Sequence, residues 1–136
     1  AHSKHEIEQK LLRVGYRPCT VEMVLYKLER EHLLNDADFA RQWVEARSGR
    51  KLGRSRIAQE LRRKGIDADE AEEALSAIGE DAQLADAIAL AEKTAARAKS
   101  DEDPRKTYQR IAAMLARRGF RWDITKEALA QVLQAD

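Results

Sequence analysis

The apolar positions of this chain follow one pattern that occurs three times. The copies align on Gly15, Gly65 and Gly119, which lie 50 and 54 residues apart. In every copy an isoleucine lies eight residues before the glycine, a leucine four before it, and another leucine ten after it. A large apolar residue follows the glycine directly, and an aliphatic one lies thirteen residues beyond it. Six matching columns indicate an internal repeat. The aligned residues are Ile7, Leu11, Tyr16, Leu25 and Leu28; Ile57, Leu61, Ile66, Leu75 and Ile78; and Ile111, Leu115, Phe120, Leu129 and Val132.

Each copy predicts two helices joined by a sharp turn. The two apolar residues before the glycine share one helical face, and so do the two that lie ten and thirteen residues after it. Glycine at the junction permits the left-handed conformation that ends a helix. Polar residues mark the helix starts. The predicted caps are Ser3 with Glu6 as a capping box, Thr20, Asp67, and Asp103 followed by Pro104.

A further helix precedes the second and third copies. Residues 35–48 carry Phe39, Trp43 and Val44 on one face, and residues 81–99 form an alanine-rich helix with the same role. The predicted organisation is therefore a module at 1–32 without its first helix, a three-helix module at 34–79 and another at 81–136. Because the chain begins in mid-module without a methionine, we expect further residues upstream. The predicted fold is all-α, with about eight helices in tandem three-helix modules, in an elongated, curved arrangement.

The composition supports an all-α, soluble protein. Of 136 residues 36% are charged, with only 6 glycines, 2 prolines and 7 aromatic residues. Alanine, leucine, glutamate, arginine and lysine dominate, and these residues lose little on entering a helix. Cys19 is the single cysteine, which excludes an internal disulfide and a multi-thiolate metal site. No apolar run approaches the ~20 residues of a membrane span, and the first residues are no signal peptide. We expect a cytoplasmic protein without a membrane partner.

The net charge of +1 hides a strong segregation of charge along the chain. Residues 41–64 carry nine basic and two acidic side chains, and residues 104–122 carry six basic and none acidic. Residues 67–103 carry three basic and twelve acidic side chains. Such blocks create local potentials that a whole-chain isoelectric point conceals.

The sequence offers little support for catalysis or for a cofactor. His2, His5 and His32 have no carboxylate cluster nearby, and Cys19 has no predictable base, so structural roles are favoured. The acidic run 67–73 resembles a calcium loop but lacks the glycine at its sixth position and the carboxylate at its twelfth. Motifs for phosphate-cradling loops and for hydrolases are absent. We therefore expect no metal or cofactor site.

The basic residues are the candidate binding site. Five of them lie in or beside a short linker, residues 49–53, that has a glycine at each end. A helical bundle does not need so many cations in such a linker for its stability. We predict that they bind a partner or DNA; a merely solvated surface is the alternative. They are Arg47, Arg50, Lys51, Arg54 and Arg56. A second set lies in the last turns of two helices, where cations also favour the helix dipole. It comprises Arg62, Arg63, Lys64, Arg117 and Arg118.

An ordinary DNA-reading helix-turn-helix is excluded. The segment 54–78 has the right outline, but its second helix carries a series of carboxylates that would face phosphates with like charge. These are Asp67, Asp69, Glu70, Glu72 and Glu73.

Several stretches resemble the RecX family of recombination regulators. They are LLNDADFA at 33–40, WVEAR at 43–47, and a segment from Gly53 through Ile57, Glu60 and Leu61 to Lys64-Gly65-Ile66. The serine-led opening at 3–7 and the tandem modules are also similar, so the resemblance spans essentially the whole chain. It is weakest in the alanine-rich stretch 81–103, and the missing leader helix is a departure from the family.

This resemblance implies a regulatory function and a protein that is not an enzyme. RecX-like proteins modulate the RecA recombinase, mainly by binding the RecA–single-stranded DNA filament and opposing its ATP hydrolysis and strand exchange in DNA repair and recombination. We expect a monomer whose basic segment faces the filament or its DNA. One alternative is a nonspecific DNA-binding helical module without a protein target. The aromatic residues available for base stacking are few and lie mostly at predicted core columns, which weakens that alternative. An inert helical adaptor is the third possibility.

Overall fold

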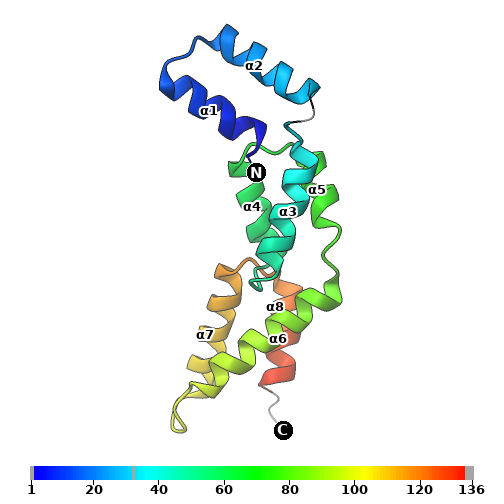
Figure 1. The fold of residues 1–136 in the computed structure, drawn as a ribbon. Coiled ribbons are helices and arrows are strands. Elements are labelled where there is room, and N and C mark those ends of the chain that lie inside the picture. Colours follow the sequence, from blue (N-terminus) through cyan, green and yellow to red (C-terminus); the bar gives the residue numbers. More distant parts are fainter. Residues whose placement is uncertain (1, 32, 134–136) are drawn as a thin grey trace. The chain divides into compact units, whose positions relative to one another are not determined.

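The described part of the chain consists of eight α-helices (Figure 1). A computed structural model describes residues 2–31 and 33–133; His32, for which we expected a structural role, lies outside them. The helices are α1 Lys4–Val14, α2 Pro18–Arg30, α3 Asp36–Ser48, α4 Arg54–Arg63, α5 Ala68–Leu75, α6 Glu80–Ala96, α7 Pro104–Arg117 and α8 Trp122–Val132. The described residues contain no strand, which confirms the predicted all-α fold.

The three repeat glycines end their helices in the same way. Gly15, Gly65 and Gly119 have φ values of 110°, 77° and 93°, in the left-handed region that glycine enters without strain. In each turn the glycine N–H donates to the carbonyl three residues back, and the next N–H reaches the carbonyl of the leucine column. These paired bonds satisfy carbonyls that the helix end leaves free. The predicted turn is therefore confirmed in all three copies.

The helix starts follow the predictions with one exception. Ser3 and Glu6 form the expected capping box, and Asp103 caps α7 by accepting from the N–H of Arg105. Thr20 is not a cap, because α2 already begins at Pro18. The fixed φ of proline and its missing N–H suit the first helical position, so the helix starts two residues earlier than predicted.

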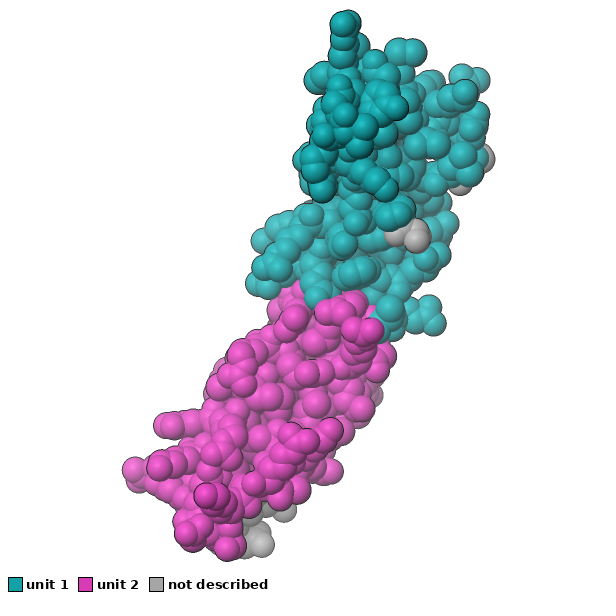
Figure 2. Space-filling model, turned by 60° about the vertical axis from the view of Figure 1, so that its left-hand side comes forward, with its two compact units in different colours: residues 1–46, 58–75 teal, residues 47–57, 76–136 magenta. Residues whose placement is uncertain are grey.

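The chain divides into two compact units (Figure 2). Unit 1 holds the described residues of 1–46 and 58–75, and unit 2 holds those of 47–57 and 76–136. Helices α3 and α4 each contribute residues to both units. This division is by spatial contact, and the module boundaries at 1–32, 34–79 and 81–136 stay predictions.

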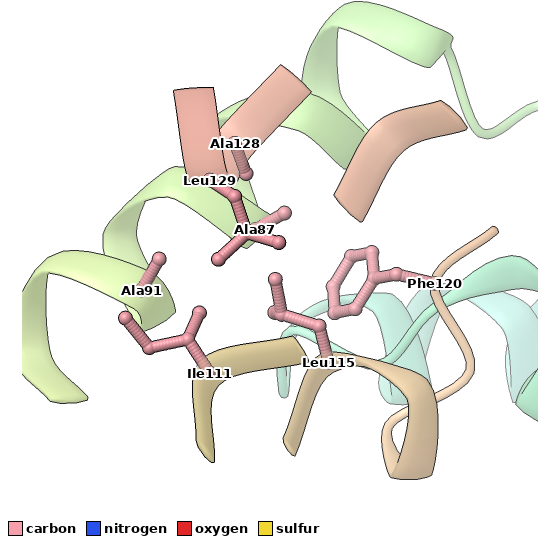
Figure 3. Packing of buried hydrophobic residues seen from close by; sticks show 7 residues of the cluster. All are labelled: Ala87, Ala91, Ile111, Leu115, Phe120, Ala128 and Leu129. Atoms are coloured by element: carbon pink, nitrogen blue, oxygen red, sulfur yellow. The ribbon is translucent and has the colours of Figure 1, made fainter. Parts of the chain in front are cut away.

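The core of unit 2 lies between α6, α7 and α8. Figure 3 shows side chains of the three helices and of the turn after α7 converging on one another. The small alanines of α6 and α8 let these helices approach closely, while the aliphatic side chains of α7 fill the space between them. The cluster comprises Ala87, Ala91, Ile111, Leu115, Phe120, Ala128 and Leu129.

In unit 1 the first copy of the repeat is less well covered than the second. Leu61 and Ile66 are buried, whereas their counterparts are a half-buried Leu11 and a Tyr16 that is 53% exposed. No helix equivalent to α3 or α6 covers this copy in the described chain. The small buried cluster of this region consists of Val21 and Leu25 from α2 together with Leu34.

The prediction that aromatic residues lie mostly in the core is wrong. Four of the seven are exposed, because only the positions of Phe39 and Phe120 face a covered interior. The exposed residues are Tyr16, Tyr26, Tyr108 and Trp122. Within the described residues, no helix combines the length and the apolar character that crossing a membrane requires.

Candidate nucleic-acid interface

The predicted basic segment forms the tight connection between α3 and α4 in unit 2. Helix α3 ends at Ser48 and α4 begins at Arg54, so only five residues join them. Leu52 is 5% exposed and anchors the connection in the interior. Arg50, Lys51 and Arg56 are exposed, and Arg47 and Arg54 are half-buried. A buried anchor with cations on either side holds the charges close to a fixed backbone.

The start of α4 is joined to the turn between α7 and α8 by backbone hydrogen bonds. The N–H of Gly53 donates to the carbonyl of Arg118 at 2.7 Å, and that of Ser55 donates to Gly119 at 3.1 Å. The two backbone segments approach so closely that a Cβ on Gly53 would overlap the backbone of Gly119 and Phe120. Glycine at position 53 is therefore a steric requirement of this contact.

Replacing Gly53 with alanine is expected to lower the free energy of unfolding by about 1–3 kcal/mol, since the added methyl forces two backbones apart. Denaturant unfolding followed by circular dichroism measures the change. Gly79→Ala is the matched control, because a Cβ at Gly79 meets nothing within 4 Å. Equal stability of the two variants would show that the close contact at Gly53 does not exist in solution.

The first amides of α4 are already occupied. Besides Gly53 and Ser55, the N–H of Arg54 donates to the side-chain oxygen of Gln83 at 3.0 Å. Gln83 is buried, and its amide nitrogen also donates to the carbonyl of Leu52 at 3.4 Å. A helix N-terminus binds phosphate through free N–H groups. Any anion that binds here must therefore be held by side chains rather than by the end of α4.

Unit 2 brings together two sets of cations that are distant in sequence. The guanidinium of Arg118 donates to the carbonyls of Arg50 and Lys51, at 2.7 and 3.2 Å. The guanidinium of Arg56 donates to the carbonyl of Arg117 at 3.3 Å. We use the term basic junction for the resulting cluster, which holds seven of the ten predicted site residues. It comprises Arg47, Arg50, Lys51, Arg54, Arg56, Arg117 and Arg118.

The other three predicted cations lie at the end of α4, in unit 1. Arg62 and Arg63 are exposed, whereas Lys64 is half-buried and takes part in internal contacts. Its ammonium lies 3.1 Å from the Glu6 carboxylate and 5.0 Å from the centre of the Trp43 ring. The side chain of Lys64 thus stabilises the fold, which favours the structural alternative for this residue.

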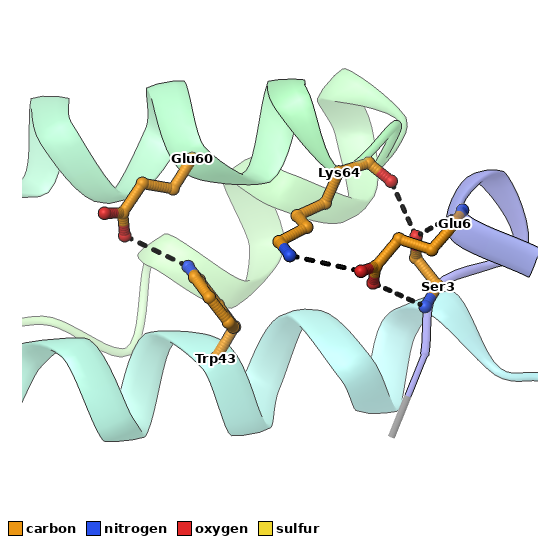
Figure 4. Close-up of polar contacts among 5 residues, drawn as sticks. All are labelled: Ser3, Glu6, Trp43, Glu60 and Lys64. Carbon is orange, nitrogen blue, oxygen red and sulfur yellow. Dashed lines mark hydrogen bonds and ion pairs between the residues drawn. The ribbon is translucent and has the colours of Figure 1, made fainter. Parts of the chain in front are cut away.

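Figure 4 shows these contacts of Lys64 together with their neighbours. The hydroxyl of Ser3 donates to the Lys64 carbonyl at 2.7 Å, and the indole N–H of Trp43 donates to Glu60 at 3.1 Å. Burial alone would raise the pKa of Glu6, but the Ser3 N–H and the Lys64 ammonium hold that pKa below its usual value. Glu6 therefore stays ionised and paired at neutral pH.

The contacts at Lys64 and at Arg118 are two versions of one junction. In the repeat, Ser3 corresponds to Gly53, and Lys64 corresponds to Arg118. Each pair is hydrogen-bonded: Ser3 donates to the carbonyl of Lys64, and Gly53 donates to that of Arg118. The repeat glycine packs closely against the start of the neighbouring helix in both.

The two junctions differ in charge. Glu6, which pairs with Lys64 in the first junction, corresponds to Arg56 in the second. The first junction holds a carboxylate in this column, so the contact between the two segments does not itself require a cation at position 56. Aligning the repeats residue by residue would have revealed this reversal from sequence.

The remaining candidates are the histidines, the cysteine and the acidic run. Residues 2–31 and 33–133 contain no group of three or more histidine, cysteine or acidic residues that could hold a metal ion. His2, His5 and Cys19 are exposed. In the acidic run, burial and the negative charges of Asp36 and Asp67 raise the pKa of Glu70.

Comparisons with known proteins agree in sequence and in fold. The model of the second three-helix domain of RecX matches residues 35–75, and that of the third three-helix domain matches 81–129. The regulatory protein RecX of Mycobacteroides abscessus is 38% identical over 96% of this chain, which spans 66% of that protein. The crystal structure of RecX from Lactobacillus salivarius has a TM-score of 0.86 at 27% identity, covering 98% of this chain and 87% of that one.

The RecX of Mycobacterium ulcerans is similar along the entire chain. It is 33% identical over 100% of this chain, which spans 79% of the relative. Because both domain models match in their expected order and the likeness extends from end to end, this chain belongs to the RecX family of regulatory proteins.

Proposed function

We propose that this chain regulates the RecA recombinase by binding the RecA–single-stranded DNA filament and opposing its ATP hydrolysis and strand exchange. It acts in the cytoplasm, in DNA repair and recombination, as a monomer without catalytic activity. Membership of the RecX family supports a regulatory role. The observation that carries the binding site is the charge reversal between the two equivalent junctions, at Glu6 and Arg56.

The basic junction suits a surface lined with phosphates. Buried Leu52 and the backbone bonds to Arg118 and Gly119 fix the start of α4, so its cations are positioned before binding. Each phosphate that a cation neutralises releases counterions, which favours binding at low salt. The proposed contact residues are the exposed or half-buried Arg47, Arg50, Lys51, Arg54, Arg56 and Arg117, with Arg62 and Arg63 as a separate pair.

Adding this chain to RecA on single-stranded DNA is expected to slow ATP hydrolysis at substoichiometric or comparable concentration. The rate is measured with filaments assembled before the chain is added, because the proposal concerns the filament. Binding to the same filaments is measured in parallel at low salt. Unchanged hydrolysis together with absent binding would refute the regulator proposal.

A nonspecific DNA-binding module is the second candidate. The exposed aromatic side chains favour it, above all Trp122, which is 59% exposed and follows the cationic Arg121. Such surfaces stack bases of single strands without reading their sequence. A module of this kind slows hydrolysis only by sequestering DNA, so an excess of free single strands restores the rate. A filament regulator that binds the filament more tightly than naked DNA still slows hydrolysis in the presence of that excess. An inert adaptor does not change the rate in either condition.

A further inference from the structure

A fourth turn in this chain has the geometry of the three glycine turns. After α3, the N–H of Lys51 donates to the Ser48 carbonyl at 3.0 Å, and that of Leu52 donates to Arg47 at 3.4 Å. These are the same two spacings that occur at Gly15, Gly65 and Gly119. A buried apolar residue, Leu52, follows the turn, as Ile66 and Phe120 follow two of the others.

Lysine stands in this turn where the other three have glycine. Lys51 has a φ of 58°, and no other non-glycine residue among those described has a positive φ. The left-handed conformation crowds the Cβ of an L-residue against the following carbonyl, so glycine is the favoured residue there. The neighbouring positions 49 and 53 already hold glycine, but position 51 does not. The side chain of Lys51 is therefore present despite an unfavourable backbone.

Arg118 holds this turn in place. Its guanidinium binds the carbonyls of Arg50 and Lys51, and its own carbonyl accepts from the N–H of Gly53. The Leu52 carbonyl accepts from Gln83 on the other side of the turn. Arg118 is half-buried, and its donors are directed at the backbone. Its counterpart Lys64 likewise makes internal contacts.

We propose that Lys51 contacts the phosphates of the single-stranded DNA or of the filament directly, and that Arg118 is a positioning residue that fixes the turn presenting Lys51. This inference rests on the proposed function and divides its site into residues with different roles. From sequence alone we counted Arg118 among the candidate binding residues, because a count of charges does not reveal where a guanidinium donates. Lysine at position 51 makes this turn less stable than glycine would, but it places a cation at a fixed position.

Lys51→Gly separates stability from binding. Relief of the left-handed strain is expected to raise the melting temperature by about 2–5 °C. Loss of one phosphate contact is expected to weaken binding about 3- to 10-fold and to reduce the magnitude of the salt slope by about 0.7 on single strands. Lys51→Ala is the matched variant: it loses the same charge but keeps the strained backbone, so binding weakens equally without a rise in melting temperature.

Arg118→Lys tests the positioning role. This variant keeps the charge but cannot bridge both carbonyls with a planar fork. We expect it to lose nearly as much affinity as Arg118→Ala, and we expect the Arg118→Ala loss to shrink when Lys51 is already alanine. Wild-type affinity for Arg118→Lys would overturn the positioning role.

The outcome for Lys51 is separable from the proposed function. Wild-type protein that binds single strands or filaments, together with Lys51→Gly that binds equally well, would refute the contact at Lys51 and leave the proposed function standing. A lower melting temperature for Lys51→Gly would refute the strained turn. Wild-type protein that binds neither single strands nor filaments would refute the proposed function itself.

Discussion

Replacing Leu61 with alanine is expected to lower the free energy of unfolding by about 2–5 kcal/mol. Leu61 occupies the leucine column of the second repeat and is fully buried in α4. Its carbonyl also accepts the N–H of Ile66, so the residue lies directly under the turn at Gly65. Truncation removes buried apolar surface and leaves a cavity that a helix tied at both ends cannot close.

Leu33→Ala is the matched control for this change, because it deletes the same atoms from a side chain that is 67% exposed. We expect its effect to stay within about 0.5 kcal/mol. Denaturant unfolding of both variants, followed by circular dichroism, gives the comparison. If Leu61→Ala were as stable as Leu33→Ala, the leucine column would not form the core.

The fold was predictable where one residue type has one structural consequence. Glycine at a fixed distance from buried leucines predicts a left-handed helix end, and the structure has one at Gly15, Gly65 and Gly119. Asp103 followed by proline likewise predicts the start of α7. The turn at Lys51 was not predictable, because lysine carries no signal for a left-handed backbone and only the surrounding hydrogen bonds impose it.

Burial was harder to predict than secondary structure. Tyr16 occupies the same repeat column as Ile66 and Phe120 yet is exposed, since burial depends on which helix covers the column. Trp122 lies two residues after buried Phe120 but at the first position of α8, where its side chain remains 59% exposed. Local periodicity does not contain this information.

The candidate site was predictable as a list of cations but not as a cluster. Residues 47–56 and 117–118 are more than sixty positions apart, and the contact between Gly53 and Arg118 that joins them is tertiary. The same contact recurs between Ser3 and Lys64, where the charges are opposite. The repeat therefore supplies an internal reference, and the departure from this reference at Arg56 supports the proposal that the basic junction binds an anionic partner.

Changing Arg50, Lys51 and Arg54 together to alanine is expected to weaken binding to single-stranded DNA and to the RecA filament strongly at low salt. The logarithm of affinity falls linearly with the logarithm of salt concentration, with a slope of about −0.7 per phosphate contact on single strands. Removal of three cations is therefore expected to flatten the slope by about 1–3 units. The backbone bonds of this segment involve main-chain atoms that alanine retains, including the Arg54 N–H to Gln83, so the helical content is expected to stay the same.

A variant with equal loss of charge elsewhere shows whether position matters. Lys10, Lys27 and Lys126 are exposed on α1, α2 and α8, and changing them to alanine also removes three positive charges. If net charge alone drives binding, the two triple variants lose the same affinity. We expect the control to keep the wild-type salt slope, because its lysines lie outside the basic junction. Salt titrations of the three proteins decide the matter: an unchanged slope for the Arg50, Lys51 and Arg54 variant would show that these side chains are only a solvated surface.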